Sequence, residues 1–273
     1  METMISIDGK LTSLREADFH PDSLLGCNKV YSIINTLGHK PLHLSIKLRY
    51  ALDSFEALYG IRPTLTVKEV AAEIYSLLHF GLYPEGGNTV ILTLEPTKDG
   101  GCSRQIFHRA ITPYEGYGLL SIRPRATIAN YEIPFERHQT SISLSAAQFT
   151  THYAGRTQQA TALRASRAGV LLSSEDSPLV AVQGFRLLTA PIAEGGRSSA
   201  EREILFRLAR LAGLEIVEES PLVEDIETYN EIFVMTPVGI LSVYSVGEFT
   251  LENIYAHILS KHLKALTSEG LAQ

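Results

Sequence analysis

The chain has 273 residues, of which 45% are hydrophobic and 20% are charged, a composition typical of a packed globular protein large enough for two ordinary domains. Its 24 basic and 30 acidic residues give a net charge of −6, which disfavours nucleic-acid binding because that function needs a basic face. No apolar stretch reaches the ~20 residues of a membrane span, and the first residues lack the basic flank and apolar core of a secretory signal. We therefore expect a cytoplasmic protein without a membrane or nucleic-acid partner.

The first 125 residues predict one α+β unit. Turn residues at 37–41 follow an apolar run and predict a hairpin. Apolar residues at helical spacing from 48 to 59 predict an amphipathic helix that ends at Gly60. Thr66 and Glu69 form a capping box, which opens a second helix ending near residue 81. Strand-like runs lie at 29–34, 89–95, 105–111 and 118–122.

A change in composition predicts the domain boundary. Residues 129–140 contain Pro134 among clustered polar residues, the composition of a linker. This interpretation gives an N-terminal domain at 1–128 and a C-terminal domain at 141–273.

The second half also predicts an α+β unit. A helix is expected at 153–168, and another opens at a capping box of Ser198 and Glu201 and ends at Gly213. Thr250 is expected to cap the last helix. Strand-like runs lie at 179–182, 185–188, 214–217, 231–235 and 240–246.

The two cysteines, Cys27 and Cys102, predict neither a disulfide framework nor a metal site. They form no close pair, and no histidine stands near either at ligand spacing. Both are expected to be ordinary buried thiols.

Lysine and arginine are distributed differently along the chain. None of the eight lysines lies between Lys98 and Lys261, a stretch of 162 residues. The same stretch holds thirteen arginines, so a general loss of basic residues does not explain the gap. A reaction that needs a lysine amine from this stretch therefore has none.

Several short segments, taken in order and spacing, carry a resemblance to a known family. They are Gly26–Ser54, Ala165–Gly169, Leu187–Pro191, Leu208–Ala209, Gly213–Glu219 and Asn230–Phe233. Together they are similar to the class IV pyridoxal-phosphate enzymes, which include branched-chain and D-amino-acid aminotransferases and 4-amino-4-deoxychorismate lyases. The resemblance covers most of the chain. It implies a two-domain α+β fold of the D-amino-acid aminotransferase type, and a homodimer.

In this family a lysine forms a Schiff base with the cofactor aldehyde, a reaction that needs a primary amine. Counting back from Gly169, the resemblance places this position near Thr150, Thr151 or His152, and a segment that begins at His138 is an alternative match. None of these side chains has a primary amine. The resemblance therefore implies that the covalent cofactor chemistry is lost.

The family also uses a carboxylate that pairs with the pyridine nitrogen and makes the ring an electron sink. The resemblance places this position near Ser173, whose hydroxyl cannot hold that nitrogen protonated. Glu175 would replace the carboxylate only if the loop shifted.

The family's phosphate contacts are altered as well. The arginine of its first long helix falls at Tyr50. Its Gly-Ile-Thr-Arg loop falls at 199–202, where only Arg202 is kept and Glu201 introduces a carboxylate. Its later threonine is matched by Thr236 with a gap, or by Pro237 without one.

One loop retains features that bind anions. Its residues, Gly195, Gly196, Arg197, Ser198 and Ser199, lead directly into a predicted helix start, where free N–H groups attract a phosphate. The alternative is a surface loop in which Ser198 only caps the helix. Glu194, Glu201 and Glu203 favour that alternative, because their charges oppose an anion.

Other side chains have both a functional and a structural interpretation. His138 and His152 are candidate general bases, because imidazole titrates near neutral pH, but exposed or structurally bonded histidines are commoner. Arg156, Arg164 and Arg167 are expected to form a solvated helix face.

Three functions remain open. The first is a non-catalytic binding or subunit protein that has lost covalent chemistry with pyridoxal phosphate, and this is the one we favour. The second is an aminotransferase or aminodeoxychorismate lyase that uses an unexpected lysine, such as Lys47, Lys98 or Lys261. The third is a cofactor-independent enzyme that uses the interdomain cleft with His or Glu as acid and base. No covalently held cofactor is expected, and a small phosphorylated ligand remains an alternative.

Overall fold

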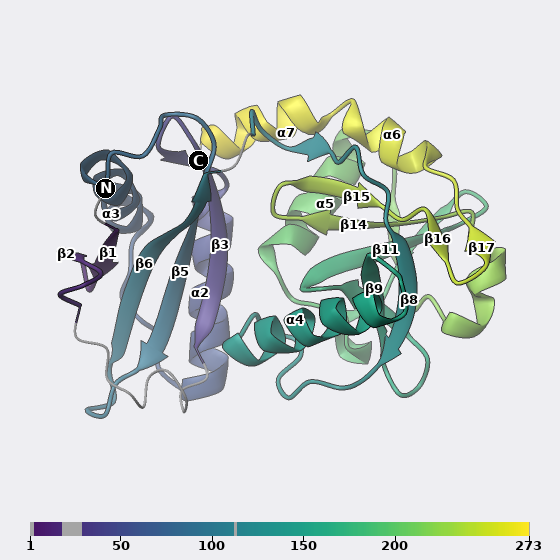
Figure 1. The fold of residues 1–273 in the computed structure, drawn as a ribbon, viewed down its shortest axis with the longest axis horizontal. Helices are drawn as coiled ribbons and strands as arrows, with labels where there is room; N and C mark the ends of the chain where they lie inside the picture. The colour runs from purple at the N-terminus through teal and green to yellow at the C-terminus, as the bar shows by residue number, and fades with distance from the viewer. Residues whose placement is uncertain (1–2, 18–28, 112–113, 273) are drawn as a thin grey trace. The chain divides into compact units, whose positions relative to one another are not determined.

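The computed structural model describes residues 3–17, 29–111 and 114–272. The chain divides into two compact units, which Figure 1 shows in ribbon form. Unit 1 comprises Met1–Gly116, Gln139–Ser141 and Thr267–Gln273, and unit 2 comprises Tyr117–His138 and Ile142–Leu266. The predicted boundary therefore moves toward the N-terminus, and the expected linker at 129–140 is not a separate connector. It begins in a strand of unit 2 and ends in unit 1.

Unit 1 is built on a six-stranded antiparallel sheet in the order β2-β1-β6-β5-β3-β4. Its strands are β1 (Met4–Ile7), β2 (Lys10–Ser13), β3 (Val30–Leu37), β4 (Lys40–Pro41), β5 (Asn88–Pro96) and β6 (Cys102–Ile111). The predicted first hairpin is confirmed as the pairing of β3 with β4.

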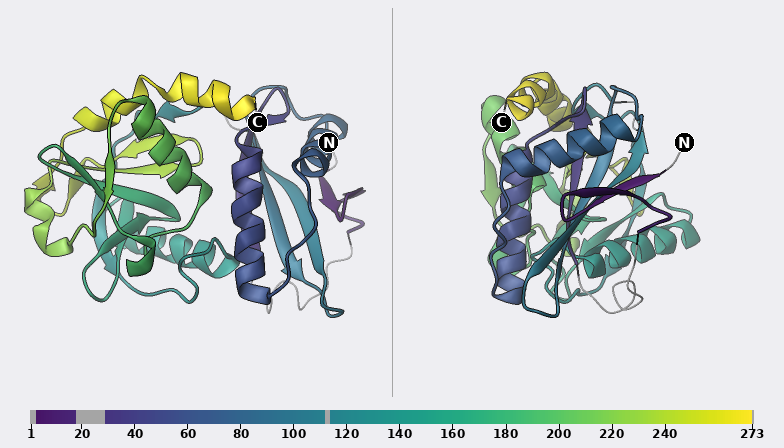
Figure 2. Two further views of the ribbon diagram at one scale, coloured as in Figure 1. Left: turned by 180° about the vertical axis from the view of Figure 1, so that it is seen from behind. Right: turned by 90° about the vertical axis from the view of Figure 1, so that its left-hand side faces the viewer.

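Two helices, α2 (Leu44–Tyr59) and α3 (Val67–Phe80), supply the core of unit 1. Ile34 of β3, Phe55 of α2 and Ile74 of α3 meet in one buried apolar cluster, so both helices pack against the sheet (Figure 2). The capping box of Thr66 and Glu69 is confirmed. The helix periodicity in the sequence therefore predicted this core correctly.

Unit 2 is built on a larger mixed sheet. Its strands are β7 (Gly118–Leu119), β8 (Arg125–Asn130), β9 (Thr161–Ala165), β10 (Leu171–Ser174), β11 (Ser177–Gln183), β12 (Arg186–Thr189), β13 (Ile216–Glu218), β14 (Glu231–Thr236), β15 (Gly239–Ser242), β16 (Ser245–Val246) and β17 (Phe249–Thr250). The main order is β17-β16-β8-β9-β10-β11-β14-β15-β7, and β12 joins β11 to β13. Short 3-10 helices lie at Ile192–Glu194 and Val223–Thr228.

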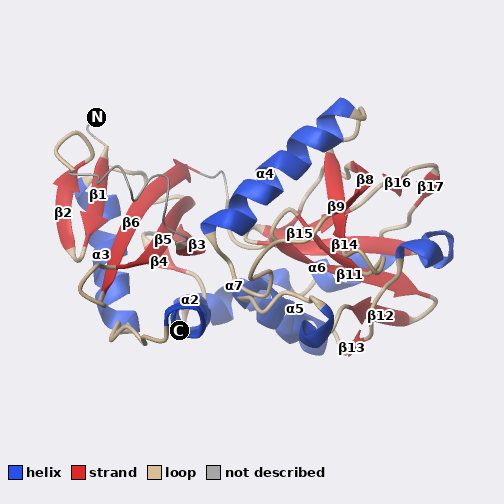
Figure 3. Ribbon diagram, turned by 90° about the horizontal axis from the view of Figure 1, so that it is seen from below, coloured by secondary structure: helices blue, strands red, loops and turns tan. Residues whose placement is uncertain are grey.

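The helices of unit 2 flank this sheet. They are α4 (Ser141–Arg156), α5 (Ala200–Leu211), α6 (Ile254–Ser260) and α7 (Leu263–Leu271), of which α7 continues into unit 1. Figure 3 shows α4 and α5 on opposite sides of the strands of unit 2. Among the described residues, no helix combines the length and the apolarity needed to cross a bilayer.

The helix predicted at 153–168 is wrong. The chain forms the parallel unit β8–α4–β9, in which α4 ends at Arg156 and 161–165 form a strand next to β8. All five residues of β9 are buried, which requires a central strand and not a solvated helix face. A buried strand and a helix segment are hard to distinguish when the apolar run is this short.

Two predicted helix caps also change. Ser199, not Ser198, is the N-cap of α5, and its side chain accepts a hydrogen bond from the backbone N–H of Arg202. The N-terminus of helix α6 is capped by a side chain of strand β14. Thr250 does not cap it, because Thr250 lies in β17. The buried carboxylate of Glu231 in β14 accepts the N–H groups of Tyr255 and Ala256, each at 2.8 Å.

Candidate functional site

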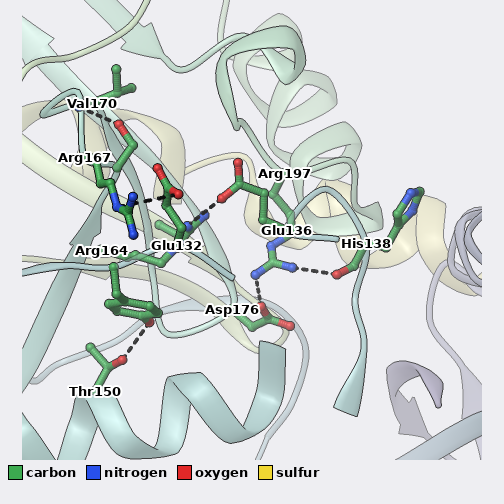
Figure 4. A network of polar contacts seen from close by, with 12 residues as sticks. Glu132, Glu136, His138, Thr150, Arg164, Arg167, Val170, Asp176 and Arg197 are labelled. Carbon is green, nitrogen blue, oxygen red and sulfur yellow. Dashed lines mark hydrogen bonds and ion pairs between the residues drawn. The ribbon is translucent and has the colours of Figure 1, made fainter. Parts of the chain in front are cut away.

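Two buried arginines define the polar centre of unit 2. Arg164 of β9 and Arg197, which precedes α5, are each only 1% exposed. A buried guanidinium has lost its hydration, so it must be matched by a carboxylate and by hydrogen bonds. Each arginine has such a match in unit 2, and both reach the segment that joins β8 to α4, residues 131–138, which we call the joining segment (Figure 4).

Arg164 pairs with the joining segment through Glu136. Its Nη1 donates to Oε2 of Glu136 at 2.9 Å, and its Nε donates to the hydroxyl of Ser173 at 3.3 Å. The guanidinium also lies 5.9 Å from the ring centroid of Tyr131, within cation–π range. Arg164 therefore ties β9, β10 and the joining segment together.

Arg197 holds the other end of the joining segment. Its Nη1 donates to the carbonyl oxygen of His138 at 2.9 Å, and its Nη2 forms an ion pair with Asp176. Asp176 also accepts a hydrogen bond from Ser143 of α4 at 3.2 Å. The charge of Arg197 is therefore matched inside unit 2, and its role as a ligand for an external anion stays a prediction.

The glycines before Arg197 are required by close packing. A Cβ on Gly196 would lie 2.1 Å from the carbonyl oxygen of Ala190, and Gly195 has a φ of +95°. A Cβ on Gly195 would also lie 2.9 Å from Oε1 of Glu136. Both glycines are buried, so this loop is packed internally and is not an open cradle for an anion.

The joining segment lines an open pocket of about 370 Å³. The pocket is lined by Glu132, Ile133, Phe135, Glu136, Arg137 and His138. Burial lowers the pKa of His138, and the charges of Arg137 and Arg197 lower it further. His138 is therefore neutral at neutral pH. Glu132 and Glu136 line the same pocket as His138.

The three positions expected for the lysine lie on α4, and two of them make local hydrogen bonds. Thr150 is buried and bonded to Tyr131 and Ala146. Thr151 donates to the carbonyl oxygen of Ala147 at 3.1 Å, and His152 is exposed. The alternative match, His138, lies in the joining segment, where its carbonyl oxygen accepts a hydrogen bond from Arg197.

At the position expected for the carboxylate that pairs with the pyridine nitrogen, the chain has a hydroxyl that faces a cation. Ser173 is 1% exposed and accepts from Arg164, so no carboxylate replaces the missing one there. Glu175 does not take its place, because it is exposed and its Oε1 lies 3.2 Å from the hydroxyl oxygen of Thr151.

The arginine kept from the expected phosphate loop is also paired. Arg202 forms an ion pair with Glu218 at 2.5 Å and reaches Thr189 at 3.3 Å. Glu201 is buried in the first turn of α5, where its charge opposes an anion.

The remaining two expected phosphate contacts, Thr236 and Tyr50, belong to different units. Thr236 ends β14, and its hydroxyl closes the β14–β15 turn by donating to the carbonyl oxygen of Gly239 at 2.8 Å. Tyr50 lies on α2 of unit 1, beneath the guanidinium of Arg49 at 4.9 Å. Within unit 2, the structure brings Gly195 to Ser199 and Arg202 together around the start of α5.

The sequence did not predict the two ion pairs. The pattern predicts Arg164 on a solvated helix face, and it predicts no role for Glu136 or Asp176. A local signal was present, because Arg164 stands between Leu163 and Ala165 in an apolar run, where an arginine needs a buried acid.

Metal binding has no support in the described part of the chain. No group of three or more His, Cys, Asp or Glu side chains could hold a metal ion there. Burial raises the pKa of Cys102 to about 11, which leaves it a protonated and unreactive thiol. Cys27 lies outside the described residues.

Comparison with known proteins assigns the fold. No protein-family model matches the chain, and no curated protein matches it in sequence. Among solved structures, the branched-chain aminotransferase of Thermoproteus uzoniensis with norvaline matches with a TM-score of 0.84 and 15% identity, covering 98% of this chain and 96% of the other. The branched-chain aminotransferase of Escherichia coli matches with a TM-score of 0.82 and 14% identity, covering 98% and 95%.

A third match is a hypothetical aminotransferase of Mycobacterium tuberculosis in its pyridoxal-phosphate-bound form. Its TM-score is 0.81 at 14% identity, and the match covers 97% of this chain and 99% of the other. The chain therefore has the fold of the class IV aminotransferases over nearly its whole length. At these identities the likeness is one of fold.

Proposed function

We propose that this protein is a class IV aminotransferase-like protein that forms no covalent adduct with pyridoxal phosphate and acts as a non-catalytic binding or subunit protein. The observation that carries the proposal is the contact between Arg164 and Ser173. When bound in this fold, pyridoxal phosphate supplies an electron sink, which depends on a protonated ring nitrogen. At the expected acid position this chain has a hydroxyl bonded to a permanent cation, which would disfavour that protonated form.

The distribution of lysine supports the proposal. Unit 2 contains only Lys261 and Lys264, and both follow α6. In unit 1, Lys47 is 1% exposed, and its Nζ donates to the carbonyl oxygen of Ile33 at 2.7 Å. Lys98 is exposed in the turn between β5 and β6.

The charges around α5 also support the proposal. Arg197 and Arg202 are paired with Asp176 and Glu218, and Glu201 adds a carboxylate at the helix start. A phosphate group would have to displace one of these carboxylates, at the cost of leaving it without its partner. The residues present do not fit a phosphorylated cofactor.

Absorption spectroscopy with added pyridoxal phosphate tests the proposal directly. We expect the spectrum of the free aldehyde, and we expect borohydride reduction followed by peptide mass spectrometry to detect no pyridoxyl-lysine. A reduced adduct at one lysine, together with transamination that disappears when that lysine is changed to Ala, would instead establish an enzyme with an unexpected lysine. Lys47, Lys98 and Lys261 are the residues to change.

One observation favours a second candidate, a cofactor-independent acid–base enzyme. His138, with its lowered pKa, and Glu136 line the same open pocket of about 370 Å³. A neutral imidazole that lines a pocket is a suitable general base. Turnover of a substrate without added cofactor, lost in the His138→Gln variant, would support this candidate over the first.

A further inference from the structure

A second hollow of unit 2 has the size of a small-molecule site. It measures about 520 Å³ and lies between the end of β8 and α4. Its lining consists of residues 128–131 and, on α4, Ala146, Phe149, Thr150 and Tyr153. Small-molecule sites in proteins usually measure about 300–1,000 Å³ and are mainly apolar with a few placed polar groups. This hollow has that size and composition, and none of the proposed roles above uses it.

Its apolar walls are open to solvent. Phe149 is 77% exposed and Tyr153 is 47% exposed, and they stand four residues apart, on one side of α4. Each is a large ring that a folded chain gains little by exposing. No residue of the lining carries a charge, and α4 contains no Asp or Glu. A neutral ring therefore complements this hollow better than a charged one, because a charged ligand would lose hydration without gaining a partner.

The polar groups of the hollow determine what the ligand must offer. Thr150 Oγ1 lies 2.6 Å from both the Tyr131 hydroxyl and the carbonyl oxygen of Ala146. A threonine hydroxyl has one proton, and a carbonyl can only accept, so the threonine proton goes to Ala146. Tyr131 then donates its own proton to Thr150. The Tyr131 oxygen is left as an acceptor in the hollow, and a ligand would meet it with an N–H or O–H donor.

Two contacts hold Tyr131, which carries the acceptor oxygen, in place. The guanidinium of Arg164 lies 5.9 Å from the Tyr131 ring centroid, and the backbone N–H of Tyr131 donates to the carbonyl oxygen of Ala165 at 3.2 Å. A fixed acceptor loses little conformational entropy when a ligand binds. The buried arginine thus orients the tyrosine.

We propose that this hollow, formed by the end of β8 and α4, binds a neutral aromatic small molecule that carries an N–H or O–H donor, such as an indole or a phenol. The ring packs between Phe149 and Tyr153, and the donor reaches the Tyr131 oxygen. This inference does not depend on whether the protein reacts with pyridoxal phosphate.

Indole is a suitable probe because the chain has no tryptophan, so its fluorescence reports the ligand alone. Titration of indole with the full-length protein should show a saturable change with one site per chain. The analogue 1-methylindole lacks the donor and should bind about 2- to 10-fold more weakly, the range of one net hydrogen bond. Equal affinity of the two ligands would overturn the inferred role of Tyr131.

Two variants separate this site from general surface binding. Phe149→Ala removes an exposed wall and should weaken indole binding about 3- to 10-fold, the range of an aromatic contact. Phe185→Ala changes a ring that is 93% exposed in the β11–β12 turn and should leave binding unchanged. Circular dichroism would verify that both variants are folded.

Three outcomes would overturn the proposal. They are no saturable indole binding up to millimolar concentration, equal affinity of the parent and Phe149→Ala proteins, and a loss of self-association in Phe149→Ala without any indole binding. The last outcome would assign this face of α4 to a second copy of the chain.

Discussion

Arg164 and Glu136 form an ion pair of 2.9 Å in which the arginine is buried and the glutamate is only 28% exposed. The pair joins β9 to the joining segment, which has no regular secondary structure of its own. Because Gly195 packs against the same carboxylate, the β12–α5 loop depends on this contact as well. The ion pair therefore links the joining segment to the β12–α5 loop. These are the two segments that the resemblance associates with the cofactor.

Removal of one partner of this ion pair should destabilise the fold. We expect Glu136→Ala to lower the free energy of unfolding by about 3 kcal/mol, because it leaves the cation of Arg164 buried and unmatched. The double variant Glu136→Ala/Arg164→Met should recover a large part of that loss. Urea titrations of the parent and the variants would measure these differences.

The exposed pair of Arg186 and Glu219 provides the control. Both side chains are 50% exposed, so Glu219→Ala should cost less than about 1 kcal/mol. If Glu136→Ala and Glu219→Ala cost the same, the buried pair has no special role.

Substitution of Gly196 should be costly. A Cβ there would lie 2.1 Å from the carbonyl oxygen of Ala190 and 2.7 Å from that of Pro191, so the backbone would have to move. We expect Gly196→Ala to destabilise by about 3 kcal/mol, the upper range for overpacking. Gly155→Ala in α4 is the matched control, because nothing lies within 4 Å of the added methyl group, and it should be neutral or stabilising by up to about 1 kcal/mol. Thermal unfolding would rank the two.

The elements of unit 1 could be predicted because their signals are local. The capping box at Thr66 and the glycine after α2 are formed by neighbouring residues. The strand pair β3–β4 follows from a short turn. Each of these features depends on contacts within a few residues, which a single sequence displays directly.

The centre of unit 2 could not be predicted because its contacts join distant segments. Arg164 meets Glu136 across 28 residues, and Arg197 meets Asp176 across 21. The burial of Arg164 depends on the strands that flank β9, and the sequence predicts β9 itself as part of a helix. A one-dimensional pattern indicates that a charge lies in an apolar run but not which acid neutralises it.

Homodimer formation remains a prediction from the resemblance. We expect light scattering at micromolar concentration to give twice the chain mass of 30.1 kDa, since an obligate interface commonly buries more than about 2,000 Å². Dilution should not change the mass. A value of 30.1 kDa would count against the dimer.

Phosphorylated ligands should not stabilise the protein. Arg197 and Arg202 are paired with internal carboxylates, so pyridoxal phosphate, inorganic phosphate and sugar phosphates should leave Tm unchanged in a thermal-shift screen. A rise in Tm with any of these ligands would show that an internal carboxylate is displaced. The Arg202→Ala variant would then identify the contact, because it should lose the rise if the start of α5 is the site.

Acidification should destabilise the protein partly through His138. Burial and the charges of Arg137 and Arg197 lower the pKa of His138 in the folded state below its value in the unfolded chain. The unfolded state therefore binds the proton more readily, and the free energy of unfolding falls as the pH drops below the ordinary histidine value of about 6.5. We expect urea midpoints of the parent to decline from about pH 7 to pH 5 more steeply than those of His138→Gln.

The control His152→Gln, which changes an exposed histidine of α4, should retain the steeper decline of the parent. Parallel pH profiles for the parent and His138→Gln would show that this imidazole does not resist protonation in the folded protein.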